Sequence, residues 1–252
     1  MRTETASDGM RRQSLYVIAA GAEGATLPFA LLAIDRVEYT YNNFRRIENA
    51  APARGDAPDA IRNTLITDSA MRLPKLSYEQ LSPEQKAVWD EVVAGPRKKM
   101  HGPFFAWLHS AELLSRGQNL GLYARFHSSL PPRLSELCIL IMSAHWKVAG
   151  EWIDHWPIAR ELSVDADALE ALRRGLPAKF KQADEIATYE FAQELLHRRD
   201  VSDTTYARTK DVLGERGVLD VVAVLGYYSF IAMTMKAFAM LPEGARDPFE
   251  GG

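Results

Sequence analysis

The chain has 252 residues, of which 47% are hydrophobic and 25% are charged, and its formal net charge at pH 7 is -3. This length and composition predict a globular protein with a substantial buried core, folded as one large domain or two small ones. The near-neutral charge lacks the basic excess typical of nucleic-acid-binding proteins and of polybasic membrane patches. We therefore expect neither a nucleic acid nor a membrane as a partner.

Cys138 is the only cysteine. One thiol per chain excludes an intramolecular disulfide and any CxxC redox or zinc motif. The cysteine content is compatible with a reducing compartment, and we expect a cytoplasmic protein.

The composition changes at about Met71. Residues 1–70 contain no lysine, whereas all nine lysines lie between Lys75 and Lys236. Short apolar runs and a stretch rich in Ala, Pro, Gly and Asp predict a poorly ordered or peripheral extension over residues 1–70, which need not belong to the native product. The folded domain is predicted to span residues 71–252.

Helical patterns follow one another after residue 71, without a convincing β-strand alternation, and predict an all-α fold. The first helix is predicted over residues 82–93, where Ser82 is suited to cap, Pro83 to start and Gln85 to complete a capping box. Further helical stretches are predicted over residues 113–126, 163–174, 183–196 and 218–240. Gly175 is suited to stop the second of these, and Ser202 with Asp203 offers capping residues for the helix after the third.

Residues 218–240 are the most apolar of these stretches. Between Asp220 and Lys236 only 15 residues occur, which is short for a membrane span. We therefore expect a helix buried in the core or in an oligomer interface.

Residues 130–159 collect an acid, a base, the thiol and three tryptophans, and they predict two helices with a break near Ala149 and Gly150. In the second helix Glu151 and His155 stand four residues apart, so both project to one side. Pro157 would remove a backbone donor there and kink or end that helix.

The pattern PRxxE, then W, then ExxxH resembles the carboxymuconolactone decarboxylase-like family, which includes the alkylhydroperoxidase AhpD-like proteins. The residues that carry the resemblance are Arg133, Glu136, Trp146, Glu151, Trp152 and His155. The resemblance covers roughly residues 75–241, with the C-terminal region at Gly226, Tyr227 and Tyr228 agreeing. It implies a compact AhpD-like helical domain with a central helical hairpin. It also implies a homo-oligomer, for which residues 218–240 would suit a subunit contact.

The peroxidase branch of this family uses a CxxC pair, whose second cysteine stands four residues before a histidine. Here Val148 and Glu151 occupy the corresponding positions before His155, and Cys138 lies on the preceding helix. A single buried thiol without a resolving partner does not support thiol peroxidase chemistry. We therefore reject that activity for this chain.

Without the CxxC pair, the motif resembles that of the decarboxylase branch. Enzymes of this branch remove carbon dioxide from a carboxylated unsaturated lactone in aromatic catabolism, without metal or organic cofactor. The resemblance implies a cofactor-independent lyase acting on a small carboxylated lactone or a related aromatic-derived compound. Isomerisation or carbon-carbon cleavage of a related ring compound would use the same residue types. The conjugated carbonyl can accept the electrons released with carbon dioxide, so the protein must supply charge stabilisation and a proton.

The resemblance and the residue chemistry together suggest a role for each site residue. His155 is the expected proton donor because imidazole titrates near neutral pH. Glu136 or Glu151 would orient or recharge it, and Arg133 would bind a substrate carboxylate. The expected apolar wall comes from Trp146 and Trp152.

Structural explanations of the same residues stay open. Arg133 and Glu136, three apart on one helix, also fit a surface ion pair, and Glu151 with His155 fits an ordinary helix-face pair. The competing function is a non-catalytic or accessory oligomeric protein. A perturbed pKa of His155 together with an enclosed pocket around it would favour the enzyme, whereas a solvent-exposed His155 without a pocket would favour the accessory role.

No HExxH or comparable ligand spacing occurs, so we expect no metal site and no cofactor. Four other histidines have no neighbouring pattern that assigns them a role: His101, His109, His127 and His197.

Overall fold

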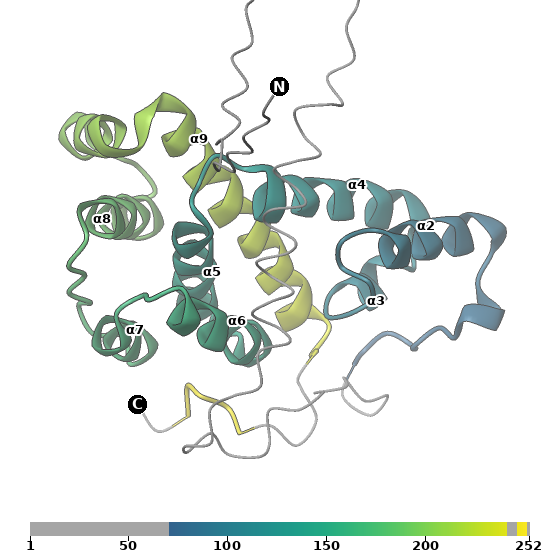
Figure 1. Cartoon of the computed structure of the whole chain (residues 1–252). Helices are drawn as coiled ribbons and strands as arrows, with labels where there is room; N and C mark the ends of the chain where they lie inside the picture. Colours follow the sequence, from purple (N-terminus) through teal and green to yellow (C-terminus); the bar gives the residue numbers. More distant parts are fainter. Residues whose placement is uncertain (1–70, 241–245, 251–252) are drawn as a thin grey trace, which may run out of the picture.

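The computed structural model describes residues 71–240 and 246–250 (Figure 1). Within these ranges every regular element is a helix and no strand occurs, which confirms the all-α prediction. The predicted extension over residues 1–70 lies outside the described residues. The elements are η2 (Tyr78–Gln80), α2 (Pro83–Ala94), α3 (Phe104–Trp107), α4 (Ala111–Leu122), the π-helical turn η3 (Tyr123–His127), α5 (Pro132–Trp146), α6 (Ala149–Glu161), α7 (Ala166–Arg173), α8 (Ala183–Arg198) and α9 (Asp203–Ala237).

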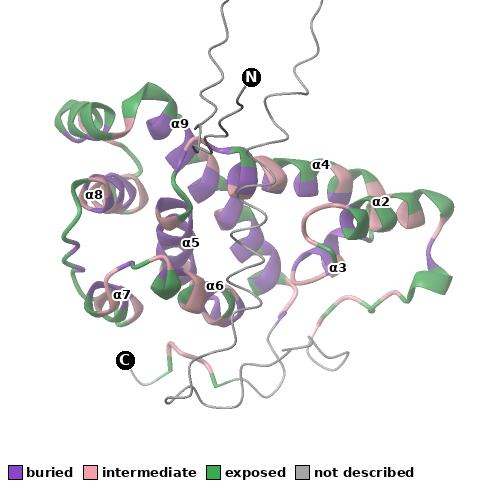
Figure 2. Ribbon diagram, viewed as in Figure 1, coloured by how far each residue is buried: buried purple, intermediate pink, exposed green. Residues whose placement is uncertain are grey.

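Helix α5 is the centre of the fold and packs against α6, α8 and α9. All ten residues from Leu134 to Ser143 are buried, as the purple of α5 in Figure 2 shows. A helix that is buried on every side needs other elements packed against each of its faces. Helices α7 and α8 flank α5 on one side, and α9 separates it from α2, α3 and α4 (Figure 1).

The turn between α5 and α6 lies two residues earlier than predicted. Lys147 adopts a left-handed conformation with φ 51° and ends α5, and Val148 is the N-cap of α6. The Ser143 hydroxyl donates to the Val148 carbonyl at 2.8 Å and fixes this turn. Ala149 and Gly150 are therefore the first residues of α6, because a left-handed residue at Lys147 already closes the preceding helix.

Pro157 lies inside α6, and the helix continues beyond it to Glu161. Proline deprives the helix of one backbone hydrogen bond. The turns on either side keep their helical conformation, so Pro157 does not end the helix.

The predicted cap of the first helix is confirmed. The Ser82 hydroxyl accepts from the Gln85 backbone N–H, and the Gln85 side chain accepts from the Ser82 N–H at 2.9 Å. Gln85 also donates to the Leu108 carbonyl at 2.8 Å, which ties α2 to the segment after α3.

Helix α7 begins at Ala166, three residues later than the start predicted at Ser163. Ser163 is left-handed, with φ 66°, so it cannot open a right-handed helix. Asp165 is the N-cap and accepts from the N–H groups of Asp167 and Ala168. Gly175, with φ 69°, follows the end of the helix as predicted.

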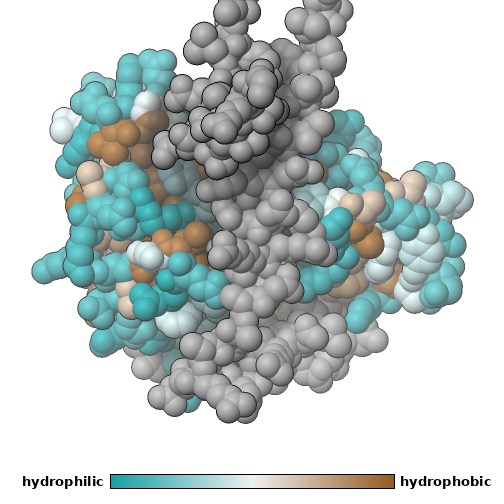
Figure 3. Space-filling view, viewed as in Figure 1, coloured by the Kyte–Doolittle hydropathy of each residue, from teal (hydrophilic) through white to brown (hydrophobic). Residues whose placement is uncertain are grey.

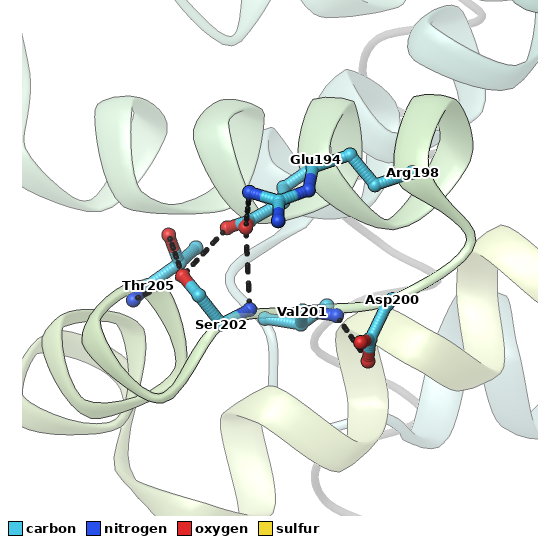
Figure 4. A network of polar contacts seen from close by, with 6 residues as sticks. All are labelled: Glu194, Arg198, Asp200, Val201, Ser202 and Thr205. Carbon is cyan, nitrogen blue, oxygen red and sulfur yellow. Dashed lines mark hydrogen bonds and ion pairs between the residues drawn. The ribbon is translucent and has the colours of Figure 1, made fainter.

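A polar network joins α8 to α9 (Figure 4). The Glu194 carboxylate accepts from the Ser202 N–H at 3.2 Å and from its hydroxyl at 3.1 Å, and it pairs with Arg198 at 3.0 Å. Ser202 is also the N-cap of α9, accepting from the Thr205 N–H. The predicted cap at Ser202 is therefore confirmed.

Helix α9 contains the predicted stretch 218–240 but begins earlier, at Asp203, and bends at Gly214, where φ is 73°. By length and composition it could cross a membrane, because it contains a sufficiently apolar window of 18 residues. Yet 61% of that window is buried inside the structure, as in the core helix of a globular domain. The helix is thus weak evidence for a membrane span.

Candidate active site

His155 lies between two carboxylates that come from both helices of the hairpin. Its Nδ1 is 2.6 Å from Oε2 of Glu136 on α5, and its Nε2 is 3.4 Å from Oε2 of Glu151, one turn earlier on α6. Only 5% of His155 and 3% of Glu136 are exposed to solvent. Both acids therefore partner the histidine, one at each ring nitrogen, with Glu136 the closer.

The surroundings of His155 favour its charged form. Burial alone would lower the pKa of His155, but the charge and hydrogen bond of Glu136 and the hydrogen bond of Glu151 outweigh it and raise the pKa to about 9. At neutral pH the ring is thus an imidazolium, with an N–H directed at each carboxylate.

Arg133 on α5 pairs with residues of α8 and not with Glu136 or His155. Its guanidinium pairs with Asp184 and with Glu185 at the start of α8, each at 2.7 Å. A surface pair with Glu136 is therefore wrong, because Glu136 faces α6 and is buried against His155. The ion pairs with α8 also occupy the group that was expected to bind a substrate carboxylate.

The two tryptophans of the motif contact partners other than His155. Trp146 donates from Nε1 to the Ser229 hydroxyl on α9 at 3.2 Å. Trp152 is buried and meets Phe249 edge-on, with ring centroids 5.5 Å apart. The aromatic ring beside the histidine is instead Tyr228 of α9, whose centroid is 5.6 Å from that of His155.

The sequence interpretation assigned no role to several residues near His155. Burial raises the pKa values of Tyr227 and Tyr228. The positive charges of Arg97 and Arg125 oppose this increase and the negative charge of Glu151 adds to it, so these side chains lie within electrostatic reach of one another. The adjacent Tyr227 and Tyr228 were visible in the sequence as part of the agreeing C-terminal region. Nothing in the sequence around Arg97 marked it out.

His101 also belongs to this group, although the sequence gave it no role. It stacks on Phe104 with ring centroids 5.4 Å apart. Burial, followed by the charges of Arg97 and Arg125, lowers the pKa of His101 to about 3, so it is neutral where His155 is charged. At pH 7 His101 is therefore neutral, whereas His155 is protonated.

Cys138 is fully buried on α5, as expected from its place on the apolar face. Burial raises the pKa of its thiol to about 12. A thiol that stays protonated and inaccessible is a poor nucleophile.

Among the described residues, no group of three or more His, Cys, Asp or Glu is arranged to hold a metal ion. An open groove of about 750 Å³ runs along α2 and α4, past Val88 and Ser115. It contains none of the residues grouped around His155, so it gives no information on that site.

No protein-family model and no curated protein matches the chain. Solved structures do match. A peroxidase-related protein from Silicibacter sp. TM1040 is 17% identical with a TM-score of 0.56, covering 69% of this chain and 93% of its own. An alkylhydroperoxidase AhpD core protein, a peroxidase-related protein from Ralstonia eutropha JMP134, is 14% identical with a TM-score of 0.57 over 71% and 95% of the two chains.

A third similar structure is the debrominase Bmp8 in complex with 2,3,4-tribromopyrrole. It is 14% identical with a TM-score of 0.52, covering 74% of this chain and 95% of its own. Identities this low establish the fold alone. The described chain therefore has the AhpD-like fold, built around the α5–α6 hairpin.

Proposed function

We propose that this protein is a cofactor-independent lyase that decarboxylates a small carboxylated lactone or a related aromatic-derived ring compound. The observation that carries the proposal is the position of the buried His155 between Glu136 and Glu151, which raises its pKa to about 9. Such a group is a proton donor whose charge is maintained at neutral pH. The debrominase of the same fold, solved with a halogenated pyrrole, supports the idea that this fold accommodates chemistry on small rings.

The proposed reaction needs no electron acceptor other than the substrate. The bond between the ring carbon and the carboxylate breaks, carbon dioxide leaves, and the electron pair moves into the conjugated carbonyl to form an enolate. The enolate then takes a proton at carbon. The positive charge of His155 stabilises the enolate, because buried charges act strongly on neighbouring ones.

The two acids have different tasks in this proposal. Glu136 is buried and holds Nδ1–H of His155, which fixes the ring and its charge. Glu151 is more exposed, with 13% of its side chain accessible, so it can exchange protons between Nε2 and the substrate or solvent. His155 is therefore the proton source and Glu151 the relay.

A non-catalytic role is less well supported. An accessory protein would not need a charged histidine with 5% exposure, since that residue contributes nothing to an interaction surface. We also propose, with the lyase activity, a cytoplasmic location and a small-molecule substrate.

The test is carbon dioxide release and loss of ultraviolet absorbance when the purified full chain is given carboxymuconolactone without added metal. We expect turnover by the wild type and a loss of at least about a hundredfold in kcat for Glu151→Gln. Glu161→Gln, which removes an exposed acid from the same helix, is the matched control. A folded wild type that releases no carbon dioxide would contradict the proposal, and so would equal kcat values in the two variants.

A further inference from the structure

Arg97, in the loop after α2, buries a guanidinium edge that has no partner among the described residues. Its Nε and Nη2 are both inaccessible to solvent and donate to no acceptor among the described residues. Its known contacts are to ring faces, with the guanidinium carbon 4.9 Å from the Phe104 centroid and 5.8 Å from that of Phe126. Buried donors are nearly always paired, so this unpaired edge is available to an acceptor on a ligand or a water molecule.

Nε and Nη2 form the side of a guanidinium that binds both oxygens of a carboxylate at once. A second unpaired polar atom lies next to them, the hydroxyl of Tyr227, which is also buried without a partner. Burial raises the pKa of Tyr227 to about 12, so this hydroxyl keeps its proton and can donate at neutral pH. Three donors thus face a common region.

Gly121 on α4 makes room for this arrangement. A Cβ at Gly121 would overlap the Tyr227 hydroxyl and stand 2.6 Å from Nη2 of Arg97. Only glycine therefore allows the two groups to approach the helix from α9 and from the loop after α2.

The region also lies within electrostatic reach of the reactive group. The charge of Glu151 acts on the pKa of Arg97, yet no ion pair joins them within the described part of the chain. Arg133, the residue first expected to bind a carboxylate, is occupied by Asp184 and Glu185. Arg97 thus has donors available within electrostatic reach of Glu151.

We propose that Arg97 and Tyr227, over Gly121, form a carboxylate-binding site for the ring compound on which Glu151 and His155 act. The inference rests on the proposed function and adds the residues that bind the acidic group. The carboxylate held there is one that the reaction leaves in place. An ion pair with the departing carboxylate would hold its negative charge and oppose the loss of carbon dioxide.

The experiment is calorimetric titration of the full chain with furoate, a ring carboxylate without a lactone, and with its uncharged amide. We expect saturable binding of furoate, a Kd at least about tenfold higher in Arg97→Gln, and a Kd about fivefold higher in Tyr227→Phe. Arg97→Lys, which keeps the charge but loses the two-pronged edge, should also bind weakly. The matched control is Lys99→Gln, which removes an exposed charge two residues away.

Stability distinguishes a binding role from a structural one. Tyr227→Phe removes an unpaired hydroxyl, so its melting temperature without ligand should equal or exceed that of the wild type. Equal furoate affinity in wild type, Arg97→Gln and Tyr227→Phe would overturn the inference. So would a lack of saturable binding by the wild type, equal binding of the amide, or displacement of furoate by an equal concentration of inorganic phosphate.

This outcome is separate from that of the proposed function. Arg97-dependent furoate binding without decarboxylation of carboxymuconolactone would leave the carboxylate site standing and remove the lyase. Decarboxylation of carboxymuconolactone with an unchanged KM in Arg97→Gln would leave the lyase standing and remove the carboxylate site.

Discussion

Glu136 and His155, 19 residues apart in the chain, form a buried contact of 2.6 Å between Oε2 and Nδ1. The left-handed residue Lys147 makes the contact possible, because it reverses the chain and brings α6 back along α5. Two charges this deeply buried are stable only together. The pair therefore sets both the protonation of the histidine and the stability of the hairpin.

The first prediction concerns the pKa of His155 in Glu136→Gln. The charge of Glu136 is the main influence that raises this pKa against the effect of burial. Without that charge burial should dominate, and the pKa should fall from about 9 to below the ordinary value of about 6.5. An NMR titration of the imidazole signals measures it.

Glu151→Gln is the comparison for this titration. Its hydrogen bond has a smaller influence on the pKa of His155 than Glu136, so we expect a smaller decrease. An equal decrease in both variants would contradict the assignment of Glu136 as the principal partner.

The second prediction concerns stability against pH. The folded protein keeps the proton of His155 up to a pH of about 9, whereas the unfolded chain loses it near 6.5. Because the folded pKa is the higher, the stabilisation is fully present below pH 6.5 and is lost as the pH rises through 9. The free energy of unfolding should fall by roughly 3 kcal/mol across this window.

Urea denaturation at several pH values between 6 and 10 would measure that change. The control is His155→Gln, which has no titrating ring but can still donate to Glu136. A slope of the same size in wild type and variant would assign the pH dependence to other groups.

The third prediction concerns Arg133, which we assign to structure instead of substrate binding. Arg133→Gln leaves Glu185, which is 1% exposed, without its cation. Removing one partner of a buried ion pair typically costs about 3–5 kcal/mol, so the variant should unfold at clearly lower urea concentration. Furoate affinity of the folded fraction should stay unchanged.

The control for Arg133 is Arg116→Gln. Arg116 pairs with Glu112 one turn away, and both side chains are more than 70% exposed, at 78% and 75%. Exposed pairs contribute little, so the urea midpoint of this variant should match the wild type. Similar midpoints for the Arg133 and Arg116 variants would contradict the structural role of Arg133.

Local features of this fold could be predicted from the sequence. Ser82 with Gln85, and Ser202, cap helices through contacts within three residues, so the signal lies in a few adjacent positions. The spacing of Glu151 and His155 also fixed their meeting on one turn. The left-handed residue at Lys147 could not be predicted, because lysine has no preference for that conformation.

Contacts between distant residues could not be predicted either. Arg133 and Asp184 are 51 residues apart, and nothing near Arg133 in sequence announces α8 as its partner. The convergence of Arg97, Gly121 and Tyr227 depends on the packing of a loop and two helices. Periodicity assigns each residue to a face, but it does not specify which faces meet.

The last prediction concerns assembly, which we infer from an apolar stripe on α9. Its exposed members recur on one side of the helix: Leu219, Val222, Phe230 and Met233, with exposures of 60%, 43%, 37% and 49%. On the face seen in Figure 3, small hydrophobic patches are exposed between larger hydrophilic areas. A stripe of this kind is typical of a subunit contact, so we expect a homo-oligomer.

Light scattering at micromolar concentration would measure the molecular mass. We expect the wild type to exceed the 28.2 kDa of one chain and the double variant Leu219→Lys with Met233→Lys to have a lower mass, because charges in an apolar contact are costly to bury. Val212→Lys is the control, since Val212 is 43% exposed but precedes the bend at Gly214. A monomeric wild type would remove the interface, and a double variant of unchanged mass would place it on another surface.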